Sequence, residues 1–247
     1  MSMGAFTSLS GIYDPLSDKS YYDQYLKFIL KAIEDYSKIP VSDILDLGCG
    51  TGSLSVLLEN EGYGMVCVDN SVEMLSIARE RSDGLLLINQ SIADFELFGT
   101  VQAAISTLDT FNYLLSKRDV ERCIKLTRNY LEAGGVFVFD VNTKYRYEHC
   151  YGERCFVYET DGGDTLIWEN EYKEPIHSLI LTTFKKRSDG AFEKGSEIQT
   201  QRLYPIELIK DILERNGFSV LGIFGGTDRS EMTETSEKAY FAARKEF

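Results

Sequence analysis

Short apolar runs alternate with helical patterns along most of this chain. The runs that predict buried strands lie at 44–47, 64–69, 85–89, 103–107 and 135–142, with a strong helical pattern at 118–132. Strands that alternate with helices predict an α/β fold with a parallel sheet. A helix at 206–216, a strand from Phe218 and a closing strand at Ala239–Ala243 continue the order. Gly134 and Gly135 predict a glycine C-cap for the helix before them.

Residues 154–204 interrupt this order. Three long, partly alternating runs, Thr165–Tyr172, His177–Phe184 and Glu197–Tyr204, are typical of antiparallel strands, with turns between them. We therefore expect one domain formed by 1–153 and 205–247, with 154–204 as an inserted antiparallel sheet. The apolar face around Trp168, Tyr172 and Phe184 must be buried. We expect it over the carboxyl ends of the core strands, or against a second copy of the chain.

The segment from Asp43 to Leu54 reads as a strand, a glycine-rich turn and the start of a helix. Gly48, Gly50 and Gly52 allow a tight turn and let a ligand lie against bare main chain. Thr51 or Ser53 is expected to cap the helix, whose free N–H groups attract anionic groups. Such a turn, early in an α/β pattern, indicates a site for a nucleotide-type cofactor.

The spacing of the glycines bears on which cofactor this is. A dinucleotide site has the pattern G-x-G-x-x-G, whereas this chain has G-x-G-x-G with Ser53 in place of the third glycine. Asp46, just before the turn, suits an ammonium group better than a pyrophosphate. A second acid, Asp69, ends the next strand and can accept both ribose hydroxyls. NAD sites use the same device, so a nicotinamide-dependent oxidoreductase stays open as an alternative.

Four motifs together resemble those of class I S-adenosylmethionine-dependent methyltransferases of the small-molecule type. They are D-L-G-C-G-T-G-S-L from Asp46, V-D-x-S-x-E-M-L from Val68, L-D-x-x-N-Y from Leu108 and L-x-x-G-G-x-F-x-F-D from Leu131. The resemblance implies a Rossmann-like fold with a seven-stranded, mostly parallel sheet. It also implies an enzyme that uses S-adenosyl-L-methionine to methylate a nitrogen or oxygen atom of a small molecule. A non-catalytic protein that binds the same cofactor is the other alternative.

The resemblance also assigns cofactor contacts. Asp46 is expected to assist binding of the methionine amino group, Gly48, Cys49 and Gly50 to form the turn under the methionyl and ribose part, and Asp69 to bind the ribose. Asn70 and Met74 are expected to flank the adenine, although an apolar residue is usual at the position of Asn70. Ser91 and the Ile92 backbone replace the usual acid at the adenine amino group, with Asp94 as the alternative. Leu108 is expected to line the methionine pocket, and Tyr13 and Tyr22 to close it.

The catalytic group is left open by the sequence, because methyl transfer by in-line displacement needs no fixed triad. Asp109, Asn112 and Tyr113 follow the fourth strand and are expected to face the acceptor, or else to cap and pack the next helix. Asp109, Tyr113 and His149 are the catalytic candidates, while His177 is expected to be structural. The cysteines show no metal spacing, so no metal site is predicted.

Net charge, apolar runs and cysteine content limit the kinds of partner and compartment that we expect for this protein. The net charge of −13 disfavours nucleic acid, whose phosphates demand positive charge. The chain has no apolar run long enough to span a membrane and no signal peptide, and its five cysteines read as reduced thiols. We therefore expect a cytoplasmic monomer or homodimer that acts on a small-molecule methyl acceptor.

Overall fold

The computed structural model describes residues 19–246, and a seven-stranded sheet forms its centre. In spatial order the strands are β10 (Phe218–Phe224), β11 (Lys238–Lys245), β5 (Leu131–Asn142), β4 (Val101–Ser106), β1 (Asp43–Leu47), β2 (Gly64–Asp69) and β3 (Leu86–Asn89). β11 runs antiparallel to both of its neighbours, and the other neighbouring pairs are parallel. This confirms the predicted seven-stranded, mostly parallel sheet.

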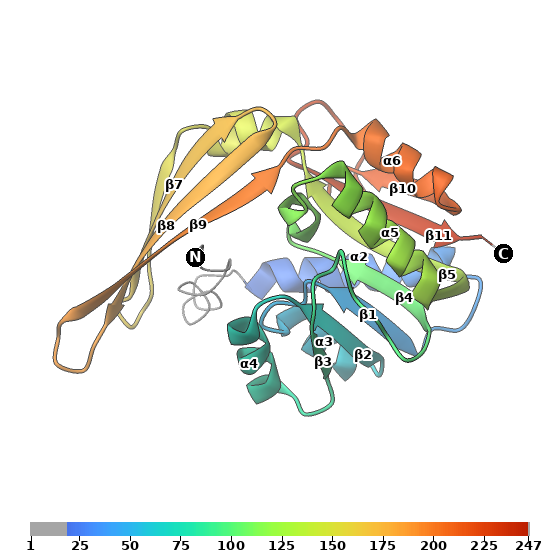
Figure 1. The fold of residues 1–247 in the computed structure, drawn as a ribbon, viewed down its shortest axis with the longest axis horizontal. Helices are drawn as coiled ribbons and strands as arrows, with labels where there is room; N and C mark the ends of the chain where they lie inside the picture. The colour runs from blue at the N-terminus through green and yellow to red at the C-terminus, as the bar shows by residue number, and fades with distance from the viewer. Residues whose placement is uncertain (1–18, 247) are drawn as a thin grey trace.

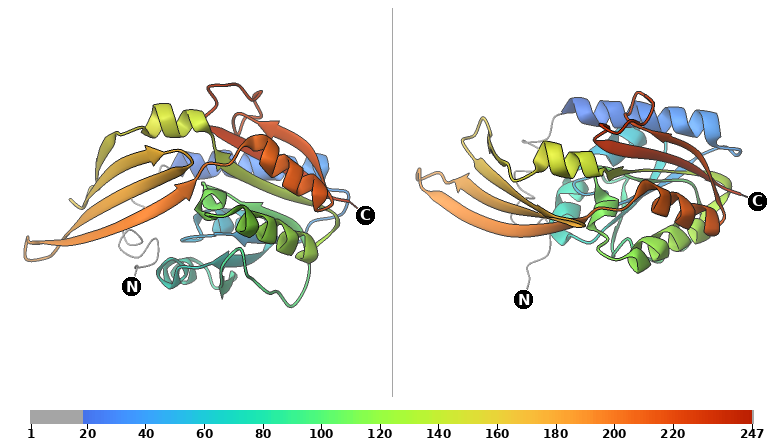
Figure 2. Two further views of the ribbon diagram at one scale, coloured as in Figure 1. Left: turned by 45° about the horizontal axis from the view of Figure 1, so that its top comes forward. Right: turned by 90° about the horizontal axis from the view of Figure 1, so that it is seen from above.

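Helices cover both faces of this sheet (Figures 1 and 2). α2 (Lys19–Tyr36) and α3 (Ser53–Asn60) contribute to the hydrophobic cluster on one face. α5 (Lys117–Tyr130) and α6 (Ile206–Arg215) pack into the cluster on the other face. α4 (Val72–Arg81) lies against β2 and β3. The central strands are therefore covered on both sides, which explains their continuous apolar runs.

A second, four-stranded sheet extends from one end of the core (Figure 1). Its strands are β6 (Cys155–Glu159), β7 (Thr165–Lys173), β8 (Ile176–Lys186) and β9 (Phe192–Arg202), and each pairs with the next in antiparallel register. We call them the inserted sheet. The predicted insertion of an antiparallel sheet is confirmed. The sequence missed β6 and the first half of β9, because both segments are mostly exposed and show no alternation of buried and exposed positions.

Two short helices join the core to this sheet. η1 (Thr110–Tyr113) is a single 3-10 turn directly after β4, and its Asn112 side chain donates to the Arg202 carbonyl at the end of β9. η2 (Arg146–Tyr151) is a π-helix between β5 and β6, and its Tyr147 and Tyr151 rings pack against His177 of β8. The sequence did not predict this π-helix.

Two of the predicted helix ends are wrong. The residue at the N-cap of α3 is Gly52, in the left-handed conformation, and not Thr51 or Ser53. α5 runs into β5 through Leu131, which is already extended, so no glycine caps it. Gly135 serves a bulge in β5 instead, where a Cβ atom would lie 2.5 Å from the Gln102 carbonyl oxygen. Ser71 caps α4, since its hydroxyl accepts from the Met74 N–H.

None of the helices within residues 19–246 is long and apolar enough to span a membrane. The five cysteines are not joined by disulfides in the structure.

Candidate active site

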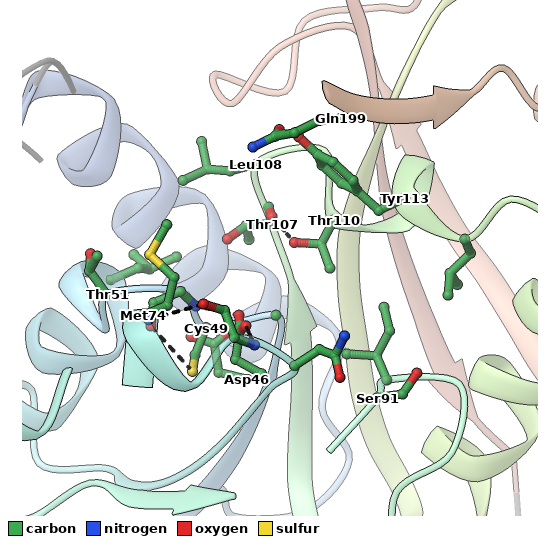
Figure 3. A pocket seen from close by; sticks show the side chains of 18 of the residues that line it. Asp46, Cys49, Thr51, Met74, Ser91, Thr107, Leu108, Thr110, Tyr113 and Gln199 are labelled. Atoms are coloured by element: carbon green, nitrogen blue, oxygen red, sulfur yellow. Dashed lines mark hydrogen bonds between the residues drawn. The ribbon is translucent and has the colours of Figure 1, made fainter. Parts of the chain in front are cut away.

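A cavity of about 360 Å³ lies at the carboxyl ends of β1, β2, β3 and β4, where β9 approaches the core (Figure 3). Ligands of open α/β sheets bind at this edge, and the volume is that of an ordinary small-molecule pocket. All the predicted cofactor residues that the structure describes line it: Tyr22, Asp46, Gly48, Cys49, Gly50, Asp69, Asn70, Met74, Ser91, Ile92 and Leu108. Tyr13 lies outside the described residues.

The glycine turn forms one wall, and its glycines have different roles. The N–H groups of Gly48 and Cys49 both donate to the Val68 carbonyl, which anchors the turn to β2. A Cβ atom at Gly48 would collide with Thr110, whereas at Gly50 it would meet nothing within 4 Å. Gly52 lies against Ala78 and Leu85 and permits close packing. The open space for a ligand is therefore at Gly50, and Gly52, unlike Gly48 and Gly50, does not line the cavity.

Asp46 is a buried carboxylate at the end of β1, with only 2% of its surface exposed. Its Oδ2 accepts from the Ser55 hydroxyl at 2.6 Å, while Oδ1 has no hydrogen-bond partner among the described residues. Burial raises the pKa of this carboxyl to about 7, with the Ser55 hydrogen bond opposing the shift. A buried acceptor that lacks a donor is costly, so the site is suited to a cationic N–H donor.

Asp69 ends β2 and holds the turn as well as facing the cavity. Its carboxylate accepts from the Gly50 N–H at 2.9 Å and from the Ser71 N–H at 2.8 Å. Burial raises the pKa of this group, while these backbone hydrogen bonds lower it. The link to Gly50 couples the two motifs, which the sequence showed only as separate segments.

Beyond β3 the structure separates the two candidates for the adenine end. Ser91 and Ile92 line the cavity. Asp94 is exposed, does not line it, and pairs with Arg122 of α5 at 2.5 Å. The preference for Ser91 over Asp94 agrees with this arrangement.

The loop after β4 sends its side chains in different directions. Tyr113 lines the cavity and donates its hydroxyl hydrogen to Gln199 Oε1 of β9, 2.5 Å away (Figure 3). Asp109 does not line the cavity, because its carboxylate pairs with the buried ammonium group of Lys238. Asn112 is fully buried, and its side chain binds the main chain of Asn142 and Arg202. It therefore does not face the cavity, contrary to the expectation that it faces the acceptor.

Neither histidine reaches the cavity. His149 is exposed on η2, where its ring lies beside that of Tyr145. His177 is buried in β8, and its Nε2 lies 3.0 Å from Asn170 Oδ1. Burial lowers the pKa of His177 to about 4, so it is neutral at physiological pH. The structural role expected for His177 agrees with this environment.

The sequence missed the cavity residues opposite the glycine turn. These are Thr107 and Thr110 near the end of β4, Leu114 and Leu115 after η1, and Ile198, Gln199 and Thr200 in β9. One signal was available for β9, because Glu197, Gln199 and Gln201 place polar side chains on one face of the strand. All three are buried. A polar face that is buried indicates a site or a network rather than a core.

The cavity fits S-adenosylmethionine on three observations. Asp46 offers a buried, unpaired acceptor for an ammonium group, Gly50 leaves space over the main chain, and Asp69 offers a carboxylate one strand away. β1 lies between β2 and β4 in the sheet. Asp46 at the end of β1 therefore lies between Asp69, which ends β2, and Leu108, which follows β4.

Comparison with known proteins agrees with this fit. A family model described as a methyltransferase domain matches residues 44–135. A putative methyltransferase of Geobacillus sp. strain WCH70 is 30% identical over 246 residues, which cover 97% of this chain and 99% of the relative. A glycine/sarcosine N-methyltransferase of Halorhodospira halochloris is 27% identical over 189 residues, which cover 69% of this chain and 70% of that relative.

A solved structure extends the match to the whole fold. The S-adenosylmethionine-dependent methyltransferase from Clostridium acetobutylicum ATCC 824 superposes with a TM-score of 0.86 at 26% identity, covering 99% of this chain and 100% of that one. These matches set aside the nicotinamide-dependent alternative. The chain belongs to the class I S-adenosylmethionine-dependent methyltransferases, with S-adenosylmethionine as its methyl donor.

Proposed function

We propose that this enzyme transfers the methyl group to a nitrogen or oxygen atom of a small molecule. The observation that carries the proposal is the continuity of the cavity. It runs from the cofactor residues of β1, β2 and β3 to a wall formed by β4, η1 and β9. A cavity of about 360 Å³ partly covered by a sheet suits a small acceptor better than a polymer chain.

In this proposal the cofactor lies along the carboxyl edge of the sheet. Asp46 receives the methionyl ammonium group, Gly48 to Gly50 lie under the methionyl and ribose part, and Asp69 binds the ribose hydroxyls. The adenine lies between Asn70 and Met74 on one side and Ser91 and Ile92 on the other. The methionyl end with its methyl group then points toward Leu108, and Tyr22 of α2 covers the site.

The acceptor then binds between β4 and β9. The polar side chains there are Thr107, Thr110, Tyr113, Gln199 and Thr200, and Leu115 and Ile198 line the same end. Hydroxyl and amide groups orient a polar acceptor through hydrogen bonds, and the leucine and isoleucine cover its apolar part. Residues 154–204 act in this proposal as the unit that completes the acceptor chamber.

The chemistry asked of this wall is mainly positioning. Methyl transfer is an in-line displacement at a cationic sulfur, and correct alignment in a dry site supplies much of the rate. An amine acceptor brings its own lone pair once it has lost its proton. The relative from Halorhodospira halochloris is named for glycine and sarcosine, which are amines of this kind. Tyr113 is the titratable side chain that this wall offers among residues 19–246.

The test follows the methyl group. The protein is incubated with a total cell extract and with S-adenosylmethionine that is labelled in its methyl group. The reaction mixture is then separated into small molecules, protein and nucleic acid. We expect the label in the small-molecule fraction, and loss of that signal with Asp69→Ala. Glycine and sarcosine serve as defined acceptors in parallel. Label in protein or nucleic acid alone contradicts the proposal.

A further inference from the structure

A lysine is buried at the start of β11, outside the cavity, and one of its partners, Asp109, directly follows the cavity residue Leu108. Lys238 is only 3% exposed. Its Nζ donates to Asp140 Oδ2 at 2.8 Å and to the Tyr25 hydroxyl at 3.2 Å, and it pairs with the Asp109 carboxylate. Four segments therefore meet at one ammonium group: α2, the loop after β4, β5 and β11. We call these four residues the Lys238 cluster.

The cluster is held together by charge. Asp140 is fully buried, and Arg146 brings a second positive charge close to Asp109. Burial alone would raise the pKa of Asp109, but the charges of Lys238 and Arg146 lower it to about 2. The same carboxylates raise the pKa of Lys238 despite its burial. Asp109 is therefore ionised at physiological pH, whereas burial raises the pKa of Asp140, with the charge of Lys238 opposing that shift. Removal of the Lys238 ammonium group leaves both carboxyl groups buried without their cationic partner, which is destabilising locally.

The first thing the cluster holds is a strained turn. Leu108 and Asp109 both have positive φ angles, 56° and 69°, and residues other than glycine rarely adopt this backbone conformation. Asp140 accepts from the Asp109 N–H at 3.2 Å, and Lys238 holds the Asp109 carboxylate. Leu108 lines the cavity. The cluster thus fixes the backbone that presents Leu108 to the ligand.

The second thing the cluster holds is the covering helix. Tyr25 is fully enclosed between α2 and the sheet, and its hydroxyl meets Lys238. Tyr22 lies three residues earlier on the same helix, hence on the same face, and lines the cavity. Lys238 is therefore bonded to both the helix that carries Tyr22 and the turn that carries Leu108.

We propose that Lys238 is a positioning residue that sets the spacing between Tyr22 and Leu108 at the methionyl end of the cofactor. The assignment of that end rests on the proposed cofactor placement. β4 lies on the far side of β1 from β2, so a ribose at Asp69 and an ammonium group at Asp46 leave the methionyl side for Leu108. In that placement the adenosine end is bound by β2, α4 and the loop after β3, and the hydrogen bonds and ion pairs that join the four residues of the cluster involve none of these elements.

The experiment compares two ligands that differ in the methionyl part. S-adenosylhomocysteine has the whole amino acid, and 5′-methylthioadenosine has the adenosine without it. Their dissociation constants are measured by calorimetry for the wild type and Lys238→Met. We expect Lys238→Met to weaken S-adenosylhomocysteine at least about tenfold, since small displacements of positioning groups have large effects. Binding of 5′-methylthioadenosine should change less than about twofold.

Two further variants separate positioning from general damage. Lys245→Met removes another lysine of β11, whose ammonium group binds the Arg128 and Leu131 carbonyls away from the cavity. It should leave both ligands within about twofold of wild type. Tyr25→Phe keeps the ring and removes only the hydroxyl at Lys238, so it reports on the cluster even when Lys238→Met does not fold. We expect about threefold weaker S-adenosylhomocysteine and unchanged 5′-methylthioadenosine.

Equal weakening of both ligands would show that the cluster only supports the fold, and unchanged S-adenosylhomocysteine binding in Lys238→Met would also overturn the inference. These outcomes are independent of the acceptor. A wild-type protein that labels protein or nucleic acid refutes the proposed function while the ligand comparison still decides the role of Lys238.

Discussion

The core sheet and the inserted sheet use opposite arrangements of polar and apolar side chains. In β1 and β4 the residues facing both helix layers are apolar and buried, and the polar groups appear only at the strand ends. In β9 one face carries Glu197, Gln199 and Gln201, all buried, while Ile198 on the other face is 66% exposed. The cavity therefore meets the core at the ends of its strands, whereas in the inserted sheet it meets side chains from both faces of β9, Gln199 on one and Ile198 and Thr200 on the other. In the proposed placement, the cofactor end thus depends on the strand ends of the core, and the acceptor end on individual side chains.

The first prediction tests the difference in packing and has the largest effect. Phe139 of β5 is 1% exposed and stacks on Phe111 and Phe241 at centroid distances of 4.5 and 4.8 Å. Phe139→Ala should lower the free energy of unfolding by about 3–5 kcal/mol, because it leaves a cavity that the neighbours cannot fill. Ile198→Ala in the inserted sheet should change it by about 0.5 kcal/mol or less. Urea denaturation measures both, and equal effects would contradict the comparison.

The second prediction concerns the cofactor end and its dependence on pH. Burial raises the pKa of Asp46 to about 7, above its unfolded value of 3.8. Between about pH 4 and pH 7 the Asp46 carboxyl is protonated in the folded protein without ligand but ionised in the unfolded chain. The contribution of Asp46 to the free energy of unfolding therefore falls as the pH rises through this range. An ammonium group needs the ionised carboxylate. Affinity for S-adenosylhomocysteine should thus be about tenfold lower at pH 6 than at pH 8.

Asp46→Asn is the matched control for this dependence. It should bind more weakly at pH 8 and lose most of the change between the two pH values, as measured by calorimetry. A wild-type affinity that is the same at both would show that Asp46 does not bind the ammonium group.

The third prediction concerns the acceptor end and has the smallest effect. Gln199→Ala removes the partner of the Tyr113 hydroxyl. We expect kcat/KM for the identified acceptor to fall about threefold to tenfold, as for the loss of one hydrogen bond. Affinity for S-adenosylhomocysteine should stay within about twofold. Ser196→Ala, at an exposed position of β9 that does not line the cavity, should change neither. If Gln199→Ala weakened S-adenosylhomocysteine binding as much as it lowered kcat/KM for the acceptor, the proposed division between the two ends would be wrong.

The contrast also explains what the sequence could and could not predict. Asp46 and Asp69 lie at the ends of buried strands and Gly50 follows the first of these strands, so local pattern alone places all three at one edge of the sheet. The buried strands were found for the same reason. Gln199 and Thr200 reach the cavity only through the docking of β9 on the core, a contact between segments far apart in the chain that spacing does not encode.

Asp109 shows a second reason for error. Its position after β4 indicated the acceptor chamber, but a buried lysine 129 residues later in the chain attracts its carboxylate away from the cavity. Charge pairing across the fold decided the direction of this side chain. A motif fixes where the backbone lies, while the partner of a charged group has to be found in three dimensions.

The position of β9 at the edge of its sheet has a consequence for how such enzymes diversify. β9 has one strand neighbour, β8, and it touches the core through a few side chains at its end. Replacements at positions 198–200 therefore alter the cavity wall that we propose meets the acceptor, while every strand of the core keeps its neighbours. Selection for a new acceptor can act on this strand without opposing selection for folding or for the methyl donor.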